Sequence, residues 1–171
     1  MKLNIKVLDE QLHTVRDFLF HYSSYRILLQ NVEALLEKES CEFWVYTINA
    51  HYYQAINLWS MVFGTDSNEI HWKNIGLNPE LGTLIISDLN LSEKEYYLYW
   101  KEITEWRNNS SAHRGPDFRR STPTPGLETA RNVIFVYEKW VNKHIDPSLE
   151  FSFKKVEEEY CKDVEKIINV F

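Results

Sequence analysis

The chain has 171 residues, of which 44% are hydrophobic and 15% aromatic, and its formal net charge at pH 7 is −6. This length and apolar content suffice for one domain with a substantial core, so we expect a single helical domain over residues 1–171. The acidic charge argues against binding of duplex nucleic acid through broad phosphate contacts, because proteins that do so are usually basic.

The cysteine content and the start of the chain indicate a cytoplasmic protein. Cys41 and Cys161 are too few and too far apart for a disulfide scaffold or a cysteine-based zinc site. No sustained apolar run opens the sequence, so no secretory signal is expected. The most apolar stretch, residues 44–63, is interrupted by polar residues, which favours a buried helix over a membrane span.

Two long helices are predicted first. Apolar residues recur at helical spacing over residues 9–38, where His13 and His21 are interpreted as surface or helix-packing residues. Residues 43–65 contain no Asp, Glu, Lys or Arg, so this helix should be covered on nearly all sides at the centre of a bundle. Its uncharged polar residues either cross-link helices, which is the favoured interpretation, or line a cleft; they are Asn49, His51, Gln54 and Asn57.

Turn-forming residues 64–68 end that helix and lead to His71, which stands before Trp72 in a predicted loop. Packing of the His71 imidazole against Trp72 is favoured over a functional role. A short helix is predicted over residues 81–89.

The next helix leads to the strongest candidate site. Ser92 and Glu95 have the spacing of a capping box that starts a helix. Its apolar stripe runs into Arg107, whose guanidinium, if buried, needs an acidic partner, a neighbouring chain or an anion. Residues 108–111 are weak helix formers and predict a bend. On a straight helix His113 would point away from Arg107, so either the helix loosens or His113 meets Arg107 from another chain.

A long loop over residues 115–126 follows, and helices are predicted over residues 127–144 and 153–171. Residues 106–127 contain four arginines and one aspartate, which gives a local charge of +3 in an acidic chain. Arg114, Arg119 and Arg120 are candidates for binding phosphates of single-stranded RNA, and a solvated surface loop is the alternative for the last two. The predicted fold is an all-α antiparallel bundle of about five to six helices with a long loop after the motif helix.

Several other chemistries lack their motifs. The five glycines are scattered, so neither a phosphate-binding loop nor a dinucleotide-binding run is present. No His, Cys and carboxylate spacing matches a metal site, and no nucleophile elbow occurs. Neither a metal nor another cofactor is therefore predicted, and acid–base chemistry by side chains remains.

The segment Arg107-Asn108, followed by small polar residues and His113, resembles the RX4-6H motif of the HEPN superfamily (higher eukaryotes and prokaryotes nucleotide-binding domains). Residues 59–73 are more weakly similar to its abortive-infection branch. The decoy pair Arg16 and His21 has an acceptable spacing but lies in a stretch that reads as helix interior.

The resemblance implies a metal-independent endoribonuclease that is a homodimer, often part of a toxin–antitoxin or phage-defence system with an antitoxin or regulatory partner. Arg107 would hold the scissile phosphate, His113 would be the acid–base and Asn108 would orient them, while His51 and His71 are weaker candidates for supporting residues. A non-catalytic RNA- or nucleotide-binding or partner-docking module is the first alternative, in which Arg107 pairs with a buried carboxylate. A helical scaffold without a site is the second.

Overall fold

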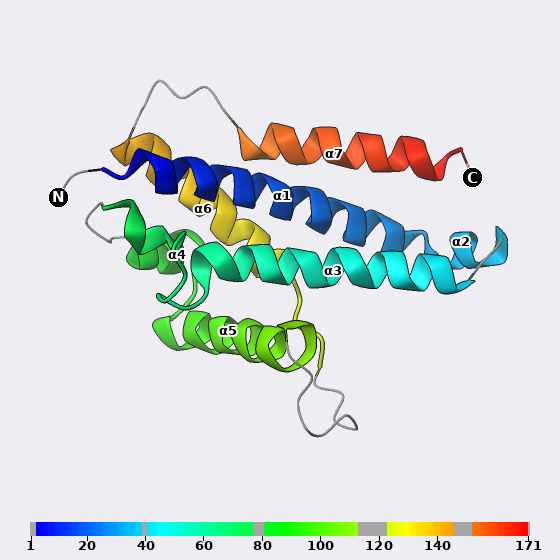
Figure 1. Cartoon of the computed structure of the whole chain (residues 1–171), viewed down its shortest axis with the longest axis horizontal. Helices are drawn as coiled ribbons and strands as arrows, with labels where there is room; N and C mark the ends of the chain where they lie inside the picture. The colour runs from blue at the N-terminus through cyan, green and yellow to red at the C-terminus, as the bar shows by residue number, and fades with distance from the viewer. Residues whose placement is uncertain (1–2, 39–40, 77–80, 113–122, 146–151, 171) are drawn as a thin grey trace.

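The computed structural model describes residues 3–38, 41–76, 81–112, 123–145 and 152–170 (Figure 1). No strand occurs in these ranges, which confirms the predicted all-α class. The described elements are, in chain order, α1 (Ile5–Gln30), α2 (Val32–Lys38), α3 (Cys41–Phe63), the 3-10 helix η1 (Trp72–Ile75), α4 (Leu81–Asp88), α5 (Glu93–Trp106), the π-helix η2 (Arg107–Ala112), α6 (Glu128–His144) and α7 (Phe153–Ile168).

The first predicted helix is in fact two helices that meet at Asn31. The Asn31 side-chain Nδ2 donates to the carbonyl of Ile27 at 2.8 Å, and its backbone N–H donates to the same carbonyl at 3.2 Å. Asparagine side chains compete for backbone groups in this way, and α1 therefore ends there. The prediction also began this helix too late, because α1 starts at Ile5 with Asn4 as its cap, whose side chain accepts from the Val7 N–H.

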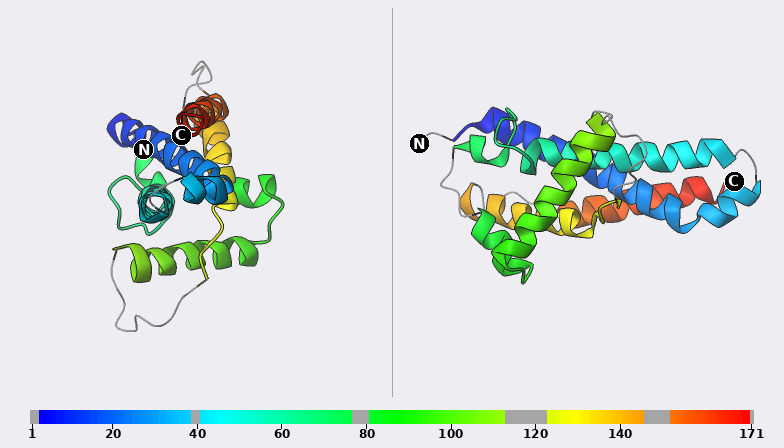
Figure 2. Two further views of the ribbon diagram at one scale, coloured as in Figure 1. Left: turned by 90° about the vertical axis from the view of Figure 1, so that its right-hand side faces the viewer. Right: turned by 90° about the horizontal axis from the view of Figure 1, so that it is seen from below.

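The helices are arranged around the antiparallel pair of α1 and α3. Figure 1 shows α7, α1, α3 and α5 one below another, with α6 running obliquely across the α1–α3 pair. The turned view in Figure 2 places α5 on the side of α3 that faces away from α7. Because α5 is the predicted motif helix, its neighbour α3 forms the other wall of the candidate site.

A stripe along α3 forms the centre of the core. Its members recur at three- and four-residue spacing, as the sequence predicted, and none is more than 9% exposed; they are Trp44, Ile48, Tyr52, Ala55, Ile56, Trp59 and Phe63. Around this stripe pack the buried faces of α1, α5 and α6, including Phe18, Ile103 and Tyr137. Burial of large apolar side chains of this kind contributes roughly 1.5–3 kcal/mol each.

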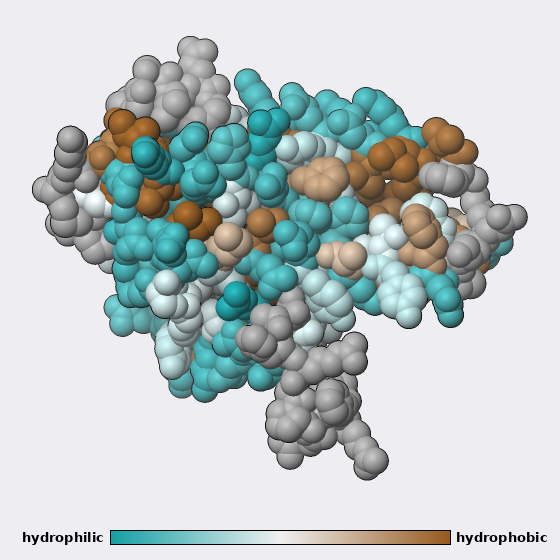
Figure 3. Space-filling model, viewed as in Figure 1, coloured by the Kyte–Doolittle hydropathy of each residue, from teal (hydrophilic) through white to brown (hydrophobic). Residues whose placement is uncertain are grey.

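The amino-terminal half of α3 is not covered on all sides, contrary to the prediction. Tyr46 is 71% exposed, Phe43 58%, Val45 45% and Tyr53 41%. Hydrophobic side chains also gather at the end of the molecule where α1, α7 and the first turns of α3 lie (Figure 3). The absence of charge on α3 after Glu42 thus reflects burial on one side and an exposed aromatic surface on the other. Neither α3 nor another helix in the described ranges is long and apolar enough to cross a membrane.

Candidate functional site

The start of α5 has the capping box that the sequence predicted. The backbone N–H of Ser92 donates to Glu95 Oε2 at 2.7 Å, and the Glu95 N–H donates to Ser92 Oγ at 3.2 Å. These two bonds satisfy amides that the first helical turn leaves free. At the other end Trp106 packs perpendicular to Tyr52 of α3, with ring centroids 5.1 Å apart. Both ends of α5 are therefore fixed. Arg107 directly follows Trp106, the last residue of α5.

Residues Arg107–Ala112 form a π-helix, so the regular α-helix loosens in the stretch where the sequence predicted a bend. The Asn and Ser side chains in this stretch give little intrinsic support to an α-helix. A π turn inserts an extra residue into the helical repeat, changes the direction of the side chains that follow, and often occurs at functional sites. The run of weak helix formers therefore coincides with the change from α-helix to π-helix directly after Trp106.

Arg107 has an incompletely satisfied guanidinium. Its Nε is buried without a hydrogen-bond partner, and its Nη1 donates to Asn108 Oδ1 at 3.3 Å. No carboxylate in the described part of the chain forms an ion pair with it. A half-buried guanidinium that lacks a counter-charge in the described part of the chain is suited to bind an anion. The sequence left three partners open for Arg107: an acidic residue, a neighbouring chain or an anion. The described part of the chain provides no acidic residue for this role.

The described residues that flank positions 113–122 contact side chains of α3 and α5. Tyr52, which packs against Trp106 before the segment, donates its hydroxyl to the Pro125 carbonyl after it at 2.7 Å. Tyr99 of α5 donates to the Gly126 carbonyl at 2.9 Å and accepts from the Ala130 N–H at 2.8 Å. The chain thus returns to the neighbourhood of Arg107. His113, Arg114, Arg119 and Arg120 lie outside the described residues, and their assigned roles stay predictions.

His51 cross-links α3 to α1, which is the favoured interpretation of the polar residues on α3. Its Nδ1 lies 2.9 Å from Nδ1 of His21, so one ring donates and the other accepts. Burial lowers the pKa of His51 to about 4, with a smaller contribution from His21, and burial also lowers the pKa of His21. Asn49 and Gln54, in contrast, are exposed and cross-link nothing described. The sequence did not predict the His21–His51 pair, because thirty residues separate its two members.

This pair predicts a loss of stability in acid. The pKa of His51 in the folded protein lies below its ordinary value of 6.5, so folding favours the neutral ring. The stability that the neutral ring contributes is therefore fully present above pH 6.5. Protonation of the accepting ring places two N–H groups face to face, so the protein loses stability as the pH falls from 6.5 towards 4. Because solvent partly screens this pair, we expect the free energy of unfolding to fall by about 1–2 kcal/mol over this range.

Urea unfolding at a series of pH values measures this effect. The variant His51→Asn should lose less free energy of unfolding between pH 6.5 and 4 than the wild type. His13→Asn is the matched control, since His13 is exposed on the same helix as His21, and its profile should follow the wild type. An identical pH profile for His51→Asn and the wild type would contradict the assignment.

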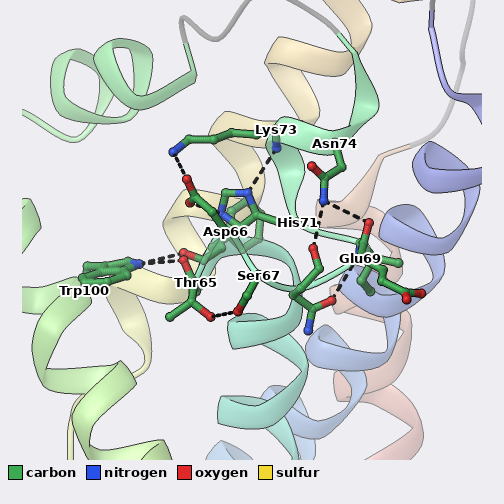
Figure 4. Close-up of polar contacts among 12 residues, drawn as sticks. Thr65, Asp66, Ser67, Glu69, His71, Lys73, Asn74 and Trp100 are labelled. Carbon is green, nitrogen blue, oxygen red and sulfur yellow. Dashed lines mark hydrogen bonds and ion pairs between the residues drawn. The ribbon is translucent and has the colours of Figure 1, made fainter.

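His71 is packed beside Trp72, as the favoured interpretation had it, and its side chain is 2% exposed. The ring centroids of His71 and Trp72 are 5.6 Å apart. Nδ1 accepts from the backbone N–H of Lys73 at 3.4 Å, while Nε2 lies 3.5 Å from Asp66 Oδ1 (Figure 4). Burial lowers the pKa of this imidazole. Both nitrogens are thus engaged in holding the loop after α3, and His71 has no described contact with Arg107.

The exposed aromatic surface beside Arg107 was not predicted from the sequence. Tyr53 lies with its ring centroid 5.5 Å from that of Trp106, and Tyr46 lies two turns earlier on the same side of α3. Helical spacing of the tyrosines in a charge-free helix was the available signal, but it does not distinguish a buried face from an exposed one.

Comparison of the chain with family models, with curated proteins and with solved structures finds no match. A function can therefore be proposed only from the chemistry of the residues.

Proposed function

We propose that the protein is a metal-independent endoribonuclease of HEPN type that acts as a homodimer in a toxin–antitoxin or phage-defence system. The single observation that carries the proposal is the state of Arg107. Its guanidinium is half-buried, has a free Nε and has no acidic partner among the described residues. A scissile phosphate would supply the missing counter-charge, because a guanidinium can donate two parallel N–H groups to phosphate oxygens.

The non-catalytic alternative expected Arg107 to pair with a buried carboxylate. The described residues provide no such pair, and Asn108, the one side chain bonded to Arg107, is neutral and exposed. A cation that has no acidic partner among the described residues and lies beside an exposed amide supports phosphate binding rather than a structural role for this arginine.

The surface of α3 next to Arg107 supports the homodimer. Phe43, Tyr46, Ala50 and Tyr53 share one exposed face, and Tyr53 reaches Trp106, the residue before Arg107. An exposed aromatic surface of this kind is typical of protein–protein interfaces. A twofold axis through this face would bring two copies of Arg107 and His113 together and complete a site of which each subunit holds half.

The reaction needs only proton transfers and stabilisation of charge. One His113 imidazole takes the proton from the 2′-hydroxyl as its oxygen attacks the adjacent phosphorus. The bond from phosphorus to the 5′-oxygen breaks, and the partner subunit's histidine, in its protonated form, gives a proton to that oxygen. Arg107 stabilises the negative charge that develops on the non-bridging oxygens. The products are a 2′,3′-cyclic phosphate and a 5′-hydroxyl.

Incubation of the protein with labelled single-stranded RNA in EDTA tests the activity. We expect cleavage that leaves 2′,3′-cyclic phosphate ends, and no cleavage of the same oligonucleotide when it carries 2′-deoxyribose at the cut positions. RNA that is bound but not cleaved would contradict the nuclease and favour the non-catalytic binding module.

The dimer requires a separate measurement. Light scattering during size-exclusion chromatography should give the mass of two chains for the wild type and of one chain for Tyr46→Glu, which places a charge on the exposed face of α3. Ile167→Glu is the matched control, because Ile167 is 56% exposed on α7, and it should remain a dimer. A monomeric wild type would contradict the shared site.

A further inference from the structure

A cavity of about 360 Å³ lies between the end of α3, η1, α4 and the first turns of α5, away from the Arg107 turn. This volume is within the usual range for sites that hold small molecules. Its walls contain five aromatic side chains, among them Trp72, Tyr96 and Trp100. The cavity does not depend on the ribonuclease proposed above.

The charged groups at the cavity favour a positive ligand. Asp66 and Glu93 contribute carboxylates, and Lys73 is the only Lys or Arg among the lining residues that the structure describes. The one lining histidine among the described residues, His71, is kept neutral near pH 7, since burial lowers its pKa. The cavity therefore carries a net negative charge next to electron-rich aromatic faces.

The position of Lys73 shows where a cation is stabilised. Its Nζ lies 2.7 Å from Asp66 Oδ2 and 5.6 Å from the centroid of the Trp72 ring. Figure 4 shows the Lys73 side chain reaching over to Asp66, with the His71 ring on the other side of the carboxylate. The Lys73 side chain is 46% exposed, so it can leave this position at little cost. An ammonium group thus already has a carboxylate and an aromatic face there.

The aromatic wall opposite is held rigidly. The indole N–H of Trp100 donates to the carbonyls of Phe63 at 2.9 Å and Gly64 at 3.2 Å, so its polar edge is satisfied within the protein. Tyr97 stacks near it with ring centroids 6.3 Å apart. Tyr96 is another residue of this wall. A preformed wall of this kind lowers the entropic cost of binding.

We propose that this cavity binds a small organic cation, such as a quaternary ammonium compound, which replaces Lys73 in its contacts with Asp66 and Trp72. Aromatic faces together with carboxylates are the established means by which proteins bind alkylated ammonium groups. A neutral nucleobase would stack on the same rings and could donate N–H groups to the carboxylates, but it would lack the attraction of a full positive charge.

Isothermal titration of the full chain with choline tests the proposal. The control ligand is 3,3-dimethylbutan-1-ol, which has the shape of choline but carries no charge. We expect choline to bind at least tenfold more tightly than this alcohol. Equal affinity for the two ligands, or tighter binding of adenosine monophosphate than of choline, would overturn the proposal.

Three variants locate the binding. Asp66→Asn and Trp100→Leu should each weaken choline binding at least tenfold, whereas Lys73→Met should strengthen it several-fold by removing the resident ammonium. A gain of affinity cannot result from misfolding, so Lys73→Met is decisive if the other variants are unstable. Lys139→Met is the matched control, since Lys139 pairs with Asp88 outside the cavity, and it should bind as the wild type does. Unchanged or weaker binding by Lys73→Met contradicts the proposal.

Discussion

Replacement of Arg107 by lysine is expected to lower the rate of RNA cleavage at least about 100-fold. Lysine keeps the charge but lacks the planar fork that bonds two phosphate oxygens at once. The loss should fall on the cleavage step itself, because the arginine acts on charge that develops in the transition state. Single-turnover cleavage of labelled RNA in EDTA, with enzyme in excess, measures that step.

The chain contains its own control for this experiment. Arg16 and His21 have the spacing of the motif, yet they lie within α1, where Arg16 Nε donates to the Tyr160 hydroxyl at 2.8 Å. Arg16→Lys should cleave at the wild-type rate, and His113→Ala should be as inactive as Arg107→Lys or more so. Wild-type cleavage by Arg107→Lys would show that the site is elsewhere, even if the protein is a ribonuclease.

The sequence predicted the features that depend on residues close together in the chain. The Ser92–Glu95 cap, the bend after Arg107 and the packing of His71 against Trp72 each involve neighbours within a few positions. Such short-range patterns have a definite local geometry, so they can be recognised without a fold. The break at Asn31 was missed because one weak helix former in a long apolar pattern is usually tolerated.

The features that the sequence did not predict depend on contacts between distant segments. The His21–His51 pair joins α1 to α3, and the cavity at Asp66 brings together residues of the loop after α3 and of α5. The exposed side of α3 was missed for a related reason. A helix face without charged residues is expected to be covered and kept from water. The sequence pattern does not show whether the same chain or a second copy of it covers that face.

The ion pair between α6 and α7 should have the largest effect on stability. Arg131 donates from Nε and Nη2 to the two carboxylate oxygens of Glu157, both at 2.6 Å, and the Glu157 side chain is 5% exposed. The variant Arg131→Met leaves that carboxylate buried without a counter-charge. We expect the free energy of unfolding to fall by about 3–5 kcal/mol. For a chain of this size the Tm, measured by calorimetry, should drop by roughly 6–20 °C.

The double variant Arg131→Met, Glu157→Met distinguishes a lost charge partner from lost packing. Removing both charges also removes the cost of burying them, so the double variant should regain most of the stability that Arg131→Met loses. Lys139→Met, which breaks an exposed pair with Asp88, should change the free energy of unfolding by less than about 1 kcal/mol. If the double variant is as unstable as Arg131→Met, the guanidinium stabilises the protein through its contact with the Phe135 ring, whose centroid lies 4.7 Å from Arg131 Cζ, rather than through its pair with Glu157.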